Sequence, residues 1–106
     1  MSEVSVIAII TPKPEHKAVA LEGFSRLAAE VEKNEPDCLV FRIHENEDGE
    51  FILFQQYKTK EAWEAHQKSE YSQKARASSE SAGGLAKEPF VKVFSTKATA
   101  GFGPRS

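Results

Sequence analysis

The stretch DCLVFRIHENEDGEFILFQQY, residues 37–57, decides the fold. Its two halves, 37–45 and 51–57, are rich in β-branched and aromatic residues, which is typical of strands. Asp48-Gly49 lies between them and is a strong hairpin signal. The alternation places Leu39, Phe41 and Ile43 on one face of the first strand and Val40, Arg42 and His44 on the other. In the second strand, Phe51, Leu53, Gln55 and Tyr57 alternate with Ile52, Phe54 and Gln56.

Helices and strands are predicted on both sides of this hairpin. Strands are expected at 4–11 and 90–96, and helices at 15–34, 60–68 and 70–81. Thr59 is a suitable N-cap, and Gly23 is expected to allow close packing of its helix on the sheet. The order strand, helix, strand, strand, helix, strand is the split βαβ motif. We therefore predict an α+β, ferredoxin-like fold with a four-stranded antiparallel sheet and helices on one face.

The strands are apolar on both faces. In the first strand Val4, Val6, Ala8 and Ile10 alternate with Ser5, Ile7, Ile9 and Thr11. Helices on one face leave the other uncovered, and exposed apolar sheet surface is unfavourable in water. The pattern predicts a homodimer in which the sheet of a second copy covers this face.

Length and composition set further limits. The chain has 106 residues, which predicts one domain at 1–97 and a mobile tail at 98–106 that is rich in Gly, Ala, Ser and Pro. A net charge of -2 gives no indication of nucleic-acid binding. A single cysteine, Cys38, suits a reducing compartment, and the sequence shows neither a signal-peptide layout nor a membrane-length apolar run. We expect a cytoplasmic protein that binds no membrane.

Several short stretches resemble the antibiotic-biosynthesis monooxygenase family, over residues 4–96. They are EFILFQQY at 50–57, EAW at 61–63, His66, Tyr71, and EPDCL at 35–39. The resemblance implies a dimeric α/β barrel. The family includes cofactor-free oxygenases of anthrones and quinols, haem-degrading enzymes, and an isomerase of a small phosphorylated sugar-like signal. The haem-degrading branch uses an asparagine in the first strand, and residues 4–11 contain none.

His66 is the leading candidate for catalysis, because a histidine exchanges protons near neutral pH. The alternative is a structural histidine that bonds to a nearby loop. Tyr57 and Tyr71 can donate a hydrogen bond to a phenolate or peroxide oxygen, or be core rings with exposed hydroxyls. Trp63 can form a flat wall for an aromatic substrate, or anchor the core.

Arg42, His44 and Phe54 complete the predicted substrate-binding set. If their strand faces line a cavity, Arg42 and His44 can bind an acidic or phenolic group. If these faces form the dimer rim, the two side chains are solvated or paired across it. Cys38 is expected to be an inert thiol, since no base lies at a diagnostic spacing.

No motif in the sequence calls for a cofactor. The three histidines lack metal-ligand spacing, and neither a phosphate-binding loop nor a dinucleotide fingerprint is present. The leading hypothesis is a cofactor-independent monooxygenase of secondary metabolism, which acts with dioxygen on a phenol, hydroquinone or anthrone. The alternative is a non-oxidative isomerase or cyclase, or a ligand-binding dimer without catalysis.

Overall fold

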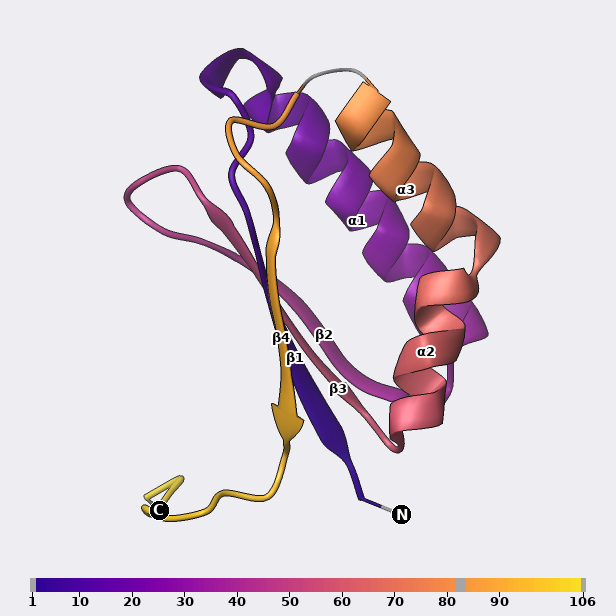
Figure 1. Cartoon of the computed structure of the whole chain (residues 1–106), viewed down its shortest axis with the longest axis vertical. Coiled ribbons are helices and arrows are strands. Elements are labelled where there is room, and N and C mark those ends of the chain that lie inside the picture. The colour runs from indigo at the N-terminus through magenta and orange to yellow at the C-terminus, as the bar shows by residue number, and fades with distance from the viewer. Residues whose placement is uncertain (1, 82–83, 106) are drawn as a thin grey trace.

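The computed structural model describes residues 2–81 and 84–105, and within them the chain forms a sheet with helices on one side (Figure 1). The strands are β1 (Val4–Ile10), β2 (Cys38–Glu45), β3 (Phe51–Tyr57) and β4 (Phe90–Ser95). The helices are the 3-10 turn η1 (Pro14–His16), α1 (Lys17–Asn34), α2 (Lys60–Lys68) and α3 (Glu70–Ser81).

The sheet has the strand order β2-β3-β1-β4, and each neighbouring pair is antiparallel. The hairpin of β2 and β3 forms as predicted, and β3 then pairs with β1 in the register Ala8 to Leu53. This order follows from the split βαβ motif. The predicted α+β, ferredoxin-like fold with helices on one face is confirmed.

Local sequence explains where the helices begin. The Thr59 side chain accepts a hydrogen bond from the backbone N–H of Ala62 at 3.1 Å, so Thr59 is the N-cap of α2. Ser69 separates α2 from α3 and accepts a hydrogen bond from the N–H of Ser72 at 3.3 Å. The predicted helix at 15–34 is instead a short 3-10 turn followed by α1, because Pro14 permits only the start of a helix here.

The core lies between the sheet and the helices. One cluster is centred on Phe24 and Phe51, whose rings meet edge to face at 5.5 Å, and another on Tyr57 and Trp63. Leu39 does not join Phe41 and Ile43 on the helix-facing side as the alternation predicted. A register shift between Cys38 and Val40 makes Leu39 an extra residue in β2, and Leu39 is 43% exposed.

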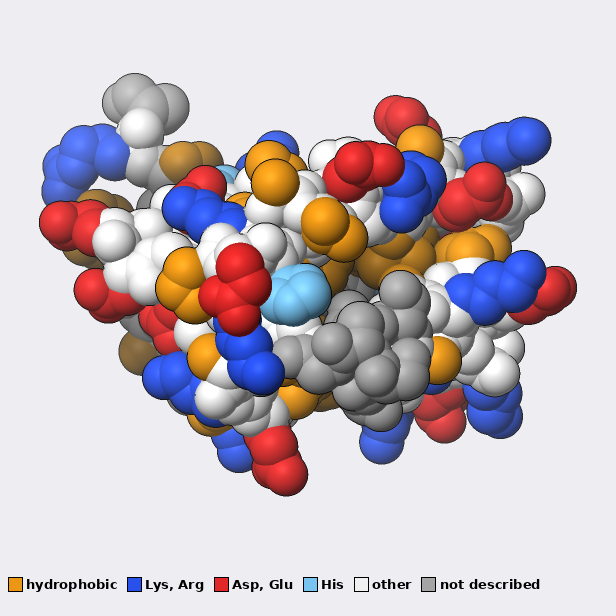
Figure 2. Space-filling model, turned by 90° about the horizontal axis from the view of Figure 1, so that it is seen from above, with side chains coloured by type: hydrophobic (Ala, Val, Ile, Leu, Met, Phe, Trp, Pro, Cys, Tyr) orange, Lys and Arg blue, Asp and Glu red, His pale blue; other side chains and the backbone are white. Residues whose placement is uncertain are grey.

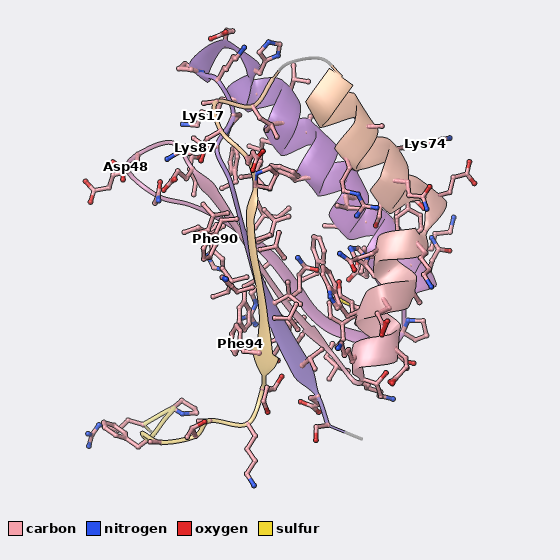
Figure 3. All side chains as sticks on the ribbon, viewed as in Figure 1. Lys17, Asp48, Lys74, Lys87, Phe90 and Phe94 are labelled. Carbon is pink, nitrogen blue, oxygen red and sulfur yellow. The ribbon has the colours of Figure 1, made fainter. Side chains whose placement is uncertain are left out.

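The other face of the sheet has no covering element among residues 2–81 and 84–105 (Figure 1). Phe90 and Phe94 of β4 point away from the helices there (Figure 3) and are 49% and 45% exposed. They lie beside Ile9 and Ser5 of β1, as the antiparallel register requires. The two-sided apolar pattern of the strands thus corresponds to one covered and one uncovered face.

The segment after β4 leaves the sheet on its uncovered side (Figure 1). Phe102 in this segment is 83% exposed, and Arg105 lies 4.9 Å from the centre of its ring. The mobility of residues 98–106 stays a prediction, and positions 1 and 106 lie outside the described residues. No helix in the described part of the chain is long and apolar enough to span a membrane.

Gly23 does not serve close packing on the sheet, contrary to the expectation from sequence. A Cβ atom placed on Gly23 would meet no atom within 4 Å. The residue borders open space in a cavity between α1 and α3.

We therefore predict that Gly23→Ala stabilises the protein. Alanine is better than glycine inside a helix by about 1 kcal/mol, and here the added methyl group meets no steric conflict. The free energy of unfolding, measured by urea denaturation, is expected to rise by up to about 1 kcal/mol. A loss of stability would show that the helix packs more tightly at Gly23 than the structure indicates.

Candidate functional site

A buried carboxylate–imidazole pair lies where the three helices meet. His66 of α2 is 6% exposed, and its Nδ1 lies 3.0 Å from both carboxylate oxygens of Glu35. Glu35 is the C-cap residue of α1, where its backbone N–H donates to the carbonyl of Val31. An ionised carboxylate has no proton to give, so Nδ1–H of the ring donates to it.

The second nitrogen of His66 is also engaged. Nε2 lies 3.3 Å from the hydroxyl oxygen of Ser72 on α3. A neutral ring with its proton on Nδ1 accepts at Nε2 from the Ser72 hydroxyl, whereas a doubly protonated ring donates from Nε2 to it. Trp63 stacks on the imidazole with ring centres 5.8 Å apart and planes inclined by 20°. The ring is therefore fixed in position by its hydrogen bonds and by packing.

Tyr71 extends this network from α3. Its hydroxyl donates a short hydrogen bond to the same Glu35 carboxylate that binds His66. Burial, the hydrogen bond to Glu35 and the negative charge of Glu35 together raise the pKa of Tyr71 to about 12. Tyr71 is thus a protonated hydrogen-bond donor at neutral pH.

Tyr71 also lies between two cavities. It lines a large cavity of about 410 Å³ between α1 and α3, and a small one of about 210 Å³ that His66 and Glu35 line. Figure 2 shows hydrophobic side chains at the bottom of a hollow at the end of the molecule where α1 begins. The large cavity is mainly apolar, with walls that include Val19, Ala20, Phe24, Leu27, Ala75 and Leu85.

The structure brings together four of the predicted site residues. His66, Tyr57 and Trp63 are in mutual ring contact, with the Tyr57 ring centre 5.6 Å from those of both His66 and Trp63. Tyr71 joins them through Glu35. Trp63 and Tyr57 line neither of the two cavities, and Tyr57 is fully buried with its hydroxyl donating to Gln55 at 2.5 Å.

The other three predicted residues lie elsewhere. Arg42, His44 and Phe54 are on the uncovered face of the sheet, where Phe54 pairs with both Arg42 and Ile7. The sheet therefore separates them from the His66–Glu35 pair and from both cavities. Arg42 and His44 are exposed and Phe54 is half-buried. Of the two sequence alternatives for Arg42 and His44, their position fits the rim rather than the cavity.

Two further groups near Glu35 are held in their protonated forms. Burial raises the pKa of the Cys38 thiol to about 11, and the nearby Glu35 charge acts in the same direction. Burial likewise raises the pKa of Tyr57, with further contributions from Cys38 and Glu35. Cys38 is therefore a thiol rather than a thiolate at neutral pH, as expected of an inert cysteine.

Sequence reasoning did not assign a role to three of the residues in this region. Glu35 entered only as part of a family resemblance, because no spacing rule connects position 35 with position 66. Ser72 was missed because its contact with His66 arises from the turn between α2 and α3. His16, which lines the large cavity, was considered only as a metal ligand.

The described residues contain no group of three or more His, Cys, Asp or Glu side chains placed to hold a metal ion. The histidines are separated by the fold: His66 lies among the helices, His44 is on the uncovered sheet face, and His16 is at the start of α1.

Comparison with known proteins agrees with this architecture. The solved structure of a Caulobacter crescentus protein assigned to the antibiotic biosynthesis monooxygenases has a TM-score of 0.84 at 24% identity, covering 92% of each chain. Rv0793 of Mycobacterium tuberculosis has a TM-score of 0.82 at 25% identity, covering 94% of this chain and all of its own. PA3566 of Pseudomonas aeruginosa has a TM-score of 0.78 at 22% identity, covering 92% of this chain and 97% of its own.

These likenesses show that the chain shares the ferredoxin-like fold of these proteins. No curated protein sequence matches it. The model of the antibiotic biosynthesis monooxygenase family matches residues 3–78, which include β1, the hairpin and the residues around His66. The chain belongs to this family.

We predict that His66→Ala destabilises the protein strongly. Removal of the imidazole leaves the buried Glu35 carboxylate with one donor fewer and takes away the ring against which Trp63 packs. Loss of a hydrogen bond to a charged group costs about 2 kcal/mol, and the lost packing of the buried ring adds to it. Urea denaturation measures the loss, and Glu64→Ala, an exposed change on the same helix, should stay within about 0.5 kcal/mol of the parent. Equal effects of the two changes would contradict a structural role for His66.

Proposed function

We propose that the protein is a cofactor-independent monooxygenase acting on an electron-rich aromatic molecule, a phenol, hydroquinone or anthrone. Membership of the family supports oxygenase chemistry. The observation that carries the proposal is the hydrogen bond from Tyr71, at the wall of a large apolar cavity, to the buried Glu35 carboxylate. This hydrogen bond links the cavity, where an apolar substrate can bind, to side chains that can accept a proton and return it.

The chemistry needs few protein groups, because the substrate is itself the reductant. A hydroxyl or acidic C–H of the bound ring loses its proton, and the resulting anion passes one electron to dioxygen. The two radicals combine at a ring carbon to give a peroxide, which takes up a proton and loses water to leave a carbonyl. One oxygen atom enters the product and the other leaves as water.

The site residues have distinct parts in this scheme. Tyr71 contacts the substrate oxygen and, as it accepts the substrate proton, passes its own proton to Glu35. His66 donates to Glu35 from the other side and holds the carboxylate in place. The same proton is then available to the peroxide. A substrate that fills the mainly apolar cavity displaces water from around the anion and the radicals.

A proton relay of this kind also serves a reaction without dioxygen. Tyr71, Glu35 and His66 move protons, and none of these groups is specific for oxygen chemistry. An isomerase or cyclase is therefore the second candidate. Conversion of a substrate under strictly anaerobic conditions would favour it, and binding without conversion would favour a ligand-binding protein.

We predict that Tyr71→Phe lowers the rate of oxygen uptake about 100-fold with little loss of stability. The change removes the hydroxyl that contacts the substrate and keeps the ring. The metal-free protein is incubated with a panel of hydroquinones and anthrones, and oxygen uptake is followed with an electrode. Tyr57→Phe is the comparison, since Tyr57 lines neither cavity.

Two outcomes would overturn this proposal. One is the absence of oxygen uptake above the blank with every member of the panel. The other is a larger loss in Tyr57→Phe than in Tyr71→Phe among folded variants, which would place the chemistry at the fully buried hydroxyl instead.

The proposed enzyme is a homodimer formed through the uncovered face of the sheet. Phe90 and Phe94 expose nearly half of their surface there, and Ile7, Ile9 and Phe54 extend the same face. Burial of such apolar surface is worth about 25 cal/mol per Å². A second sheet with the same pattern covers it by twofold symmetry, as each copy presents the same patch.

We predict that Phe94→Glu converts the dimer to a monomer. Burial of a glutamate among the apolar side chains of the interface removes its carboxylate from water, whereas on the exposed face of a monomer it is tolerated. Sedimentation velocity at micromolar concentration measures the change. Leu21→Glu is the control that should leave the dimer intact, because Leu21 is an exposed hydrophobic residue of α1 on the other side of the sheet. A parent protein that sediments as a compact monomer would contradict the proposal.

A further inference from the structure

His16 is a polar group in the large cavity that the proposed chemistry does not use. It is the N-cap residue of α1, yet its side chain makes no capping hydrogen bond. The ring lines the cavity instead. Within residues 2–81 and 84–105, no hydrogen bond or ion pair holds either of its nitrogens. A half-buried imidazole with free nitrogens beside apolar walls is available to a ligand.

The surroundings of His16 fix its position. Its backbone N–H donates to the carbonyl of Lys13 at 2.9 Å, and the N–H of Lys13 donates to the carbonyl of Gly84 at 2.7 Å. Gly84 lies directly beside the ring: a Cβ atom on Gly84 would stand 3.4 Å from Cγ of His16. Gly84 and the imidazole are therefore packed neighbours at the cavity wall.

His16 and Tyr71 lie at opposite ends of the cavity. Tyr71 bonds to Glu35, the C-cap of α1, whereas His16 is the N-cap, so the whole 18-residue helix separates the two caps. The α1 residues that line the cavity run from Val19 to Glu30, a rise of about 16 Å along the helix. A molecule with one aromatic ring cannot span this distance.

We propose that His16 is the polar contact at the end of the large cavity where α1 begins, and that the cavity binds an elongated apolar molecule with a hydrogen-bonding group at each end. The inference names the substrate class of the proposed monooxygenase and rests on that function for the identity of the reacting end. The reacting hydroxyl lies at Tyr71, the rigid apolar body lies along α1, and the distal hydroxyl or carboxylate lies at His16. A phenol with a single ring is too short to reach both ends, so it contacts Tyr71 but not His16.

The test is binding of unreactive probes of graded length by isothermal titration calorimetry. The probes carry a phenolic hydroxyl at one end and a carboxylate at the other: 4-hydroxybenzoate, 4′-hydroxybiphenyl-4-carboxylate and the corresponding para-terphenyl. Affinity for the parent protein is expected to rise with length. His16→Ala should weaken binding of the terphenyl about tenfold, the value of one hydrogen bond, and leave the benzoate unchanged.

Two variants control for a general effect on the protein. His44→Ala removes a histidine from the opposite face of the sheet and should leave all three affinities unchanged. His16→Gln keeps a hydrogen-bonding side chain at the same place and should retain more affinity for the terphenyl than His16→Ala, which keeps the test valid if His16→Ala fails to fold.

Equal affinity for the short and long probes would overturn the proposal, as would failure of all three to bind. A loss in His16→Ala that is the same for every probe would also overturn it, because His16 would then act on the fold rather than on the distal group. Since the probes are not turned over, length-dependent binding that persists without oxygen uptake would sustain this inference while the oxygenase proposal fails.

Discussion

The arrangement of the helices depends on a single carboxylate. Glu35 stands at the end of α1 and accepts hydrogen bonds from His66 of α2 and from Tyr71 of α3. A carboxylate that is mostly removed from water is stable only when hydrogen-bond donors surround it. The positions of His66 and Tyr71 are therefore coupled through Glu35. The end of α1, both later helices and the wall between the two cavities are therefore fixed at one place.

This constraint gives the region a double character. The side chains that hold the helices together can also transfer a proton. They lie beside a cavity that is mainly apolar. Stabilising and catalytic roles are consequently hard to separate at His66, whose nitrogens are both occupied and whose ring packs against Trp63. They separate more cleanly at Tyr71, where the hydroxyl can be removed and the ring retained.

The two faces of the sheet have different tasks. The helix-facing side carries the core and, beyond it, the cavities. The other side presents Phe90 and Phe94 to solvent within the single chain. Because alternate residues of a strand point to opposite faces, Arg42, His44 and Phe54 cannot share a cavity with Tyr57 of the same hairpin. Membership of the family explains the architecture. It does not specify the reaction, which depends on the side chains between the sheet and the helices.

The sequence by itself determined the elements and their order. Strand alternation, the Asp48-Gly49 turn and the Thr59 cap are local signals, and they placed β3, α2 and α3 correctly. It also supplied His66, Tyr57 and Tyr71 as catalytic candidates. Trp63 was grouped instead with Arg42, His44 and Phe54 as a substrate-binding residue, and the structure places it beside His66 and Tyr57. The prediction that Leu39 shares a strand face with Phe41 and Ile43 was wrong, since a shift of register in β2 leaves no signal in the alternation.

Only the tertiary structure decided which polar groups meet. Glu35 and His66 are far apart in the sequence, and their contact exists because α2 packs at the end of α1. The same holds for Ser72 at the imidazole and for His16 at the far end of the cavity. Local sequence patterns specify the periodicity of each helix and strand. Which side chains of different elements come into contact depends on how the elements pack. That packing is determined by the whole core.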